Sequence, residues 1–125
     1  MFEALFKIVA QVEENEQGQR VFRVTRQEAP ATERAFSSLV ATVYQQEVSR
    51  MLQAGDTLTI TVHLDLPPRE VERTVRVRED GQFEGEGIQQ PRADLLPTVS
   101  RLYGQFIEQV EPGDILTVIF RIQRL

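Results

Sequence analysis

The fold is decided by residues 52–64, LQAGDTLTITVHL, where a helical pattern changes into a strand pattern. Gly55 can adopt the positive φ that ends a helix, and Asp56 then begins the next element. Over 57–66 every second residue is apolar and the residues between them are Thr, His or Asp, as in a strand with one buried face. The stretch therefore predicts a helix that ends in a tight corner and continues as a half-buried strand.

The same corner occurs again near the end of the sequence. Residues 110–122, VEPGDILTVIFRI, repeat the Gly, Asp, Leu and Thr of the first stretch at a constant offset of 58 residues (113 minus 55). Further upstream, residues 19–26 resemble residues 72–79. We therefore predict two related halves, over about 19–66 and 71–125.

Periodicity predicts the remaining elements. Helical spacing of apolar residues favours one helix with a stripe over 36–52 and a second with a stripe over 95–110. Thr32 is a candidate N-cap of the first helix and Asp94 of the second. Further strands with alternating residues are predicted over 20–26, 71–79 and 115–125.

Two interpretations fit the N-terminal segment. Its apolar residues alternate as in a strand at Phe6, Ile8, Ala10 and Val12, but those at Phe2, Leu5, Phe6, Val9 and Val12 would also line a helix. We favour a strand that turns at 15–18 and returns through 20–26.

The predicted fold class is α+β, with a single antiparallel-type sheet and two helices on one face. Each half has the order strand, helix, strand, which together gives the βαββαβ order of a ferredoxin-like domain with an extra N-terminal strand. The alternative is a pair of hairpin-then-helix units with a closing strand. The sequence does not choose between these strand orders.

Composition limits the classes of function. The 125 residues, 41% apolar and 26% charged, are typical of one globular domain. The net charge of −5 disfavours nonspecific binding to nucleic acids or anionic membranes. Because the chain has no cysteine, thiolate metal sites and thiol nucleophiles are excluded. With neither a signal-peptide pattern nor an apolar run long enough to span a bilayer, we expect a cytoplasmic protein.

The polar side of the predicted sheet is the main candidate site. The polar residues that alternate with apolar ones in the predicted strands project away from the helices. Ile115 and Ile119 lie on the same side of the sheet and interrupt this polar pattern. The face lacks the aromatic residues on which single-stranded RNA bases stack, which disfavours RNA binding. The candidate interaction face consists of Arg23, Thr59, Thr61, His63, Arg76, Arg78, Ile115, Thr117, Ile119 and Arg121.

We favour a non-catalytic interaction or assembly module that binds a protein partner or a second copy of itself, because arginine and exposed apolar residues are common at interfaces. The alternative is a small enzyme or a binding domain for a small anionic ligand. Its pocket would lie between sheet and helices, with His63, Asp65 and Arg121 as polar groups. A third hypothesis is an anion or nucleic-acid binder on the arginine-bearing face.

Two further patterns are weak candidates for chemistry. The carboxylates and glycines of 79–87 lack the spacing of a calcium loop, so a solvated loop is the better interpretation. The pairs Gly55-Asp56 and Gly113-Asp114 are expected to belong to capping turns, not to an acidic site. We expect no cofactor and no metal site.

Overall fold

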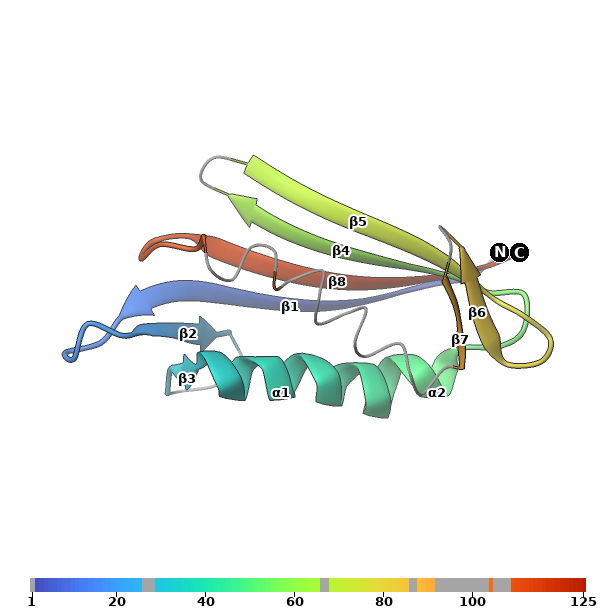
Figure 1. Ribbon diagram of the computed structural model, residues 1–125, viewed down its shortest axis with the longest axis horizontal. Helices are drawn as coiled ribbons and strands as arrows, with labels where there is room; N and C mark the ends of the chain where they lie inside the picture. Colours follow the sequence, from blue (N-terminus) through green and yellow to red (C-terminus); the bar gives the residue numbers. More distant parts are fainter. Residues whose placement is uncertain (1, 26–28, 66–67, 86–87, 92–103, 105–108) are drawn as a thin grey trace.

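The computed structural model describes residues 2–25, 29–65, 68–85, 88–91, 104 and 109–125. These residues form one antiparallel sheet and one continuous helix (Figure 1). The strands are β1 (Phe2–Glu14), β2 (Arg20–Val24), β3 (Ala31–Thr32), β4 (Thr57–Asp65), β5 (Pro68–Val77), β6 (Gln82–Gly85), β7 (Ile88–Pro91) and β8 (Ile115–Arg124). The helix comprises α1 (Glu33–Val43), a π-helical turn η1 (Tyr44–Val48) and α2 (Ser49–Met51).

The strand order across the sheet is β3-β2-β1-β8-β4-β5-β6-β7. The predicted α+β class with a single antiparallel sheet is confirmed, and so is the strand interpretation of the N-terminal segment. The ferredoxin-like βαββαβ order is not confirmed, because three strands precede the helix and three more follow β4 before residue 92. The hairpin-then-helix alternative fits the first half, in which β4 is the closing strand. The second predicted helix, over 95–110, lies largely outside the described residues.

Local sequence explains how the helix begins. Thr32 is the N-cap, and its hydroxyl accepts a hydrogen bond from the Ala35 N–H at 3.1 Å. This bond satisfies one of the backbone donors that a helix start leaves without a partner. Glu33 adds a negative charge in the first turn, where the helix dipole favours it.

The buried stripe of the helix recurs at every fourth residue. Its members are Phe36, Val40, Tyr44, Val48 and, directly after the helix, Leu52. Four residues exceed one α-helical turn of 3.6, so such a stripe drifts around an ideal α-helix. The wider π turn at 44–48 reverses part of that drift and keeps the stripe facing the sheet.

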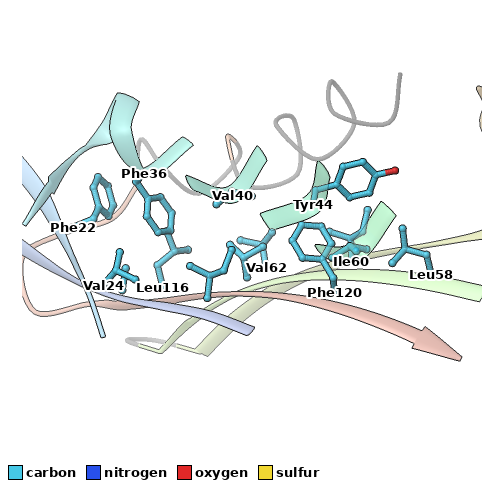
Figure 2. Close-up of a cluster of buried hydrophobic side chains, with 14 of the residues drawn as sticks. Phe22, Val24, Phe36, Val40, Tyr44, Leu58, Ile60, Val62, Leu116 and Phe120 are labelled. Atoms are coloured by element: carbon cyan, nitrogen blue, oxygen red, sulfur yellow. The ribbon is translucent and has the colours of Figure 1, made fainter. Parts of the chain in front are cut away.

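The core lies between this stripe and one face of the sheet (Figure 2). Phe36 stacks on Phe22 of β2 with 5.1 Å between ring centroids. One turn further along the stripe from Val40, Tyr44 lies 5.9 Å from Phe120 of β8. The helix therefore covers the sheet from β2 to β8, and the opposite sheet face carries no described helix.

The corner after the helix has the predicted capping geometry. Gly55 has a φ of 91°, and its N–H donates to the carbonyl of Val77 at 2.8 Å. The buried carboxylate of Asp56 accepts a hydrogen bond from the Gln53 N–H at 2.8 Å. It also accepts bonds from Nε and Nη2 of Arg124, at 2.8 and 2.9 Å, and this contact raises the pKa of the Arg124 guanidinium.

The second corner makes the same backbone bonds. Gly113 has a φ of 99° and donates to the carbonyl of Val12 at 2.8 Å, and Asp114 accepts from the Glu111 N–H at 2.9 Å. Both Gly-Asp pairs therefore serve as structural turns that join a strand to the segment before it.

Candidate functional site

The candidate site is the helix-free face of the four central strands, called the outer face below. Its members alternate with core residues and are aligned across the sheet by the strand registers. They are Glu3, Leu5, Lys7, Val9 and Gln11 on β1; Ile115, Thr117, Ile119, Arg121 and Gln123 on β8; Thr57, Thr59, Thr61, His63 and Asp65 on β4; and Glu70, Glu72, Thr74 and Arg76 on β5.

Most of the residues predicted for the interaction face lie on the outer face. Arg23 belongs to β2 and pairs with Gln11 at the border of the face. Arg78 lies in the turn directly after β5. Those brought together on the central strands are Thr59, Thr61, His63, Arg76, Ile115, Thr117, Ile119 and Arg121.

The threonines at the centre of the face are covered by their neighbours. Thr59 is 7% exposed and Thr61 is 9% exposed, although both lie on the polar side of β4. Thr59 Oγ1 shares a hydrogen bond with Thr74 Oγ1 at 3.3 Å, and Thr61 Oγ1 donates to Glu72 Oε2 at 3.4 Å. These hydroxyls therefore stabilise the pairing of β4 with β5.

His63 is held between two carboxylates. Its Nε2 lies 2.9 Å from Asp65 Oδ1 and its Nδ1 lies 3.5 Å from Glu70 Oε1, while the side chain is 31% exposed. Nδ1 is shielded from solvent and makes no hydrogen bond. Within the part of the chain that the structure describes, no three His, Asp or Glu side chains are grouped so that they could hold a metal ion.

Acidic neighbours pair with two of the four arginines predicted for the interaction face. Arg23 Nε lies 2.8 Å from Glu13 Oε2, and their hydrogen bond lowers the pKa of the Glu13 carboxyl and raises that of the guanidinium. Arg78 Nη2 lies 3.2 Å from Asp80 Oδ2 and its Nε lies 3.9 Å from Glu84 Oε2. The surroundings of Arg23 and Arg78 are therefore of mixed charge.

The sequence reasoning missed the contribution of β1 to the outer face. Leu5 is 53% exposed and stands opposite Arg121, while Lys7 stands opposite Ile119. The missed signal is the alternation of Glu3, Leu5, Lys7 and Val9 with residues that pack in or against the core, Ala4, Phe6 and Ile8. It was obscured because the same segment also fits a helical pattern.

Two cavities border the described elements. One, of about 230 Å³, lies between β1 and the helix, and another, of about 520 Å³, is a shallow hollow beside the turn after β5. Neither is lined by His63, Asp65 or Arg121, the polar groups predicted for a ligand pocket. The first is lined by Leu5, Phe6, Lys7, Ile8, Val9, Val24, Thr25, Leu39, Val43 and Glu47.

Comparison with known proteins adds no relative. No protein-family model, curated protein or solved structure matches this chain. Within the described ranges, no helix has the length and apolar character needed to cross a bilayer.

The segment 79–87, expected to be a solvated loop, instead contributes β6, in which Phe83 is buried.

Proposed function

We propose that this protein is a non-catalytic interaction or assembly module that contacts its partner, or a second copy of itself, through the outer face. The observation that carries the proposal is the presence of apolar side chains on a face that no described element covers. Leu5 is 53% exposed and Ile115 is 38% exposed, and both lie on the same side of adjoining strands as the partly exposed Ile119. Apolar residues with a polar surround are typical of protein interfaces.

The polar groups of the outer face favour this proposal over catalysis or anion binding. The carboxylates of Asp65 and Glu70 flank His63, and Glu72 lies beside Thr61. An anionic ligand placed there would meet these negative charges. A cytoplasmic location stays a prediction from the sequence.

The oligomeric state of the full chain tests the proposal. We expect light scattering after size-exclusion chromatography to give a mass above that of one chain, and Ile119→Glu to reduce it because a buried charge is costly at an interface. Gln45→Glu, at an exposed position of the helix and away from the outer face, is the matched control and should leave the mass unchanged. A chain that stays monomeric at every concentration would contradict self-assembly through this face.

We also infer that the chain is a duplication of one β-β-β-α-β unit. The strand order is symmetric about the boundary between β8 and β4, where Thr61 pairs with Ile119, its equivalent at the offset of 58 (119 minus 61). The backbone bonds of Val12 to one corner match those of Val77 to the other. In this scheme β1 corresponds to β5, β2 to β6 and β3 to β7, and the second helix is the one predicted over 95–110.

The strand equivalence differs from the one that the sequence suggested. Residues 19–26 were aligned with 72–79, which would relate β2 to β5. The proposed scheme relates β2 to β6 instead, with Phe22 equivalent to Phe83, because Phe22 pairs with Val12 and Phe83 pairs with Val77. Both phenylalanines are fully buried, which supports this assignment.

A further inference from the structure

Among the strands that the structure describes, β1 leaves part of one edge unpaired. Its C-terminal part, Ala10–Glu14, pairs with β2, and the Thr25 N–H donates to the Val9 carbonyl at 3.4 Å. No other described strand pairs with residues 2–8 on that side. An open edge of this kind offers unpaired N–H and C=O groups to another strand.

The register identifies which residues face this edge. Val12 directs its N–H and C=O toward the corner before β8. The backbone N–H and C=O groups of the even-numbered residues of β1 therefore point toward β8, and those of the odd-numbered residues point toward the opposite edge. Glu3, Leu5 and Lys7 therefore present their backbone groups at the open edge. Their side chains are exposed on the outer face.

The corresponding edge of β5 is protected in a way that β1 is not. There β6 pairs only with Arg76 and Val77, and the residues that face the rest of the edge include Pro68, Glu70 and Glu72. Proline supplies no N–H, and adjacent carboxylates repel a second copy of the same edge. The β1 edge has neither device.

The β1 edge is instead complementary to itself. In an antiparallel pair of two copies centred on Leu5, Leu5 faces Leu5, Glu3 faces Lys7 of the second copy, and Lys7 faces Glu3 of the second copy. Lys7 is the only lysine of the chain. All three positions are of the kind in which opposite residues exchange both backbone hydrogen bonds, and opposite charges across such pairs are stabilising.

The cavity of about 230 Å³ lies directly beneath this edge. Leu39 and Val43 of the helix form its apolar floor, and Phe6 of β1, which is only partly buried, borders it. In the centred register Phe2 of the second copy stands opposite Ile8, which also lines the cavity, and would border this floor. Burial of that apolar surface favours association.

We propose that two copies of the chain join their β1 edges as an antiparallel pair about a two-fold axis at Leu5, so that the two sheets become one. This contact rests on the self-assembly part of the proposed function, but it concerns the strand edge and not the outer face. The charge pattern of Glu3 and Lys7 fixes the register, and the two-fold symmetry repeats each charge pair.

Sedimentation velocity on the full chain and a charge swap test the proposal. Glu3→Lys and Lys7→Glu each place like charges opposite each other twice, so each should raise the dimer dissociation constant at least ~10-fold. The double variant Glu3→Lys with Lys7→Glu restores opposite charges and should return the constant to within ~3-fold of the original. Failure of the double variant to recover, while the single variants weaken the dimer, would overturn the register.

Leu5→Pro removes the central donor without removing a hydrogen bond to β8, and it should abolish the dimer while circular dichroism stays unchanged. Glu16→Lys, in the exposed turn between β1 and β2, is the charge-matched control and should leave the dimer intact. A dimer insensitive to all β1 variants but dissociated by Ile119→Glu would overturn the edge contact and leave the proposed function standing. A monomer at every concentration would overturn both, and polymers longer than a dimer would overturn the two-fold arrangement.

Discussion

At the scale of single residues, the two buried aspartates make equivalent turns with different numbers of partners. Asp56 accepts hydrogen bonds from the Gln53 N–H and from two nitrogens of Arg124, whereas Asp114 is seen to accept from the Glu111 N–H. We expect Asp56→Ala to cost about 2–3 kcal/mol of unfolding free energy and Asp114→Ala about 1–2 kcal/mol, because each removes hydrogen bonds to a buried carboxylate and Asp56→Ala removes more of them. Urea unfolding measures both, and equal losses would contradict this ranking.

The Glu13–Arg23 pair predicts a pH dependence of stability. The hydrogen bond from Arg23 lowers the pKa of Glu13 below its ordinary value of 4.5, so the unfolded chain takes up this proton first as the pH falls. The stabilisation is fully present above the unfolded pKa and is lost as the pH falls through the lower folded pKa. We expect the difference in unfolding free energy between the original chain and Glu13→Gln to shrink below about pH 4.5.

The partner residue provides the control for this titration. In an Arg23→Gln background the hydrogen bond is already absent, so adding Glu13→Gln should produce little change with pH. A pH-dependent difference that persists in that background would assign the effect to another group.

At the scale of elements, one glycine fixes how β6 sits beside β5. A Cβ on Gly85, whose φ is 145°, would lie 2.6 Å from the backbone carbonyl oxygen of Thr74. We expect Gly85→Ala to detach the β6 strand and to cost about 2–3 kcal/mol, since backbone must move. Gly81→Ala is the matched control at a φ of 85° with open space around it, and it should cost only about 1 kcal/mol.

Hydrogen exchange locates this effect. Faster exchange of the Phe83 region in Gly85→Ala, with β1 and β8 unchanged, is the expected outcome. Uniformly faster exchange over the whole sheet would mean that β6 is not a separable edge element.

The elements that the sequence predicted well are long segments with a regular apolar pattern and one buried face. The strand over 57–66, the corner at Gly55 and the helix from Thr32 follow from alternation, positive φ and capping. β6 was not predicted because it is short and lies in a run of Gly and Glu, and its pairing depends on the register with β5. Pattern alone also could not show that Thr59 and Thr61 are covered, because their burial comes from side chains on neighbouring strands.

At the scale of the whole molecule, the paired ends of β1 and β8 bring the two ends of the chain together. Phe2 pairs with Arg124 in the register, and the N and C labels stand side by side in Figure 1. Arg124 also lies over the ring of Phe2, 4.6 Å from its centroid. Joining the ends with a short linker should therefore disturb neither strand.

The proposed duplication makes a strong prediction for a circular permutant that joins Leu125 to Met1 and opens the chain between Leu66 and Pro67. The permuted order begins with β5 and ends with β4, so under the proposed duplication it would again consist of two β-β-β-α-β units. Because closing a short loop costs little free energy, we expect the same sheet and an unfolding free energy within about 2 kcal/mol of the original. Urea unfolding and a structure of the permutant measure this, and opening after Phe22 inside β2 is the control expected to fail. A permutant opened at 66–67 that does not fold would contradict the prediction, because it would mean that the two units cannot be exchanged in the chain order without loss of stability.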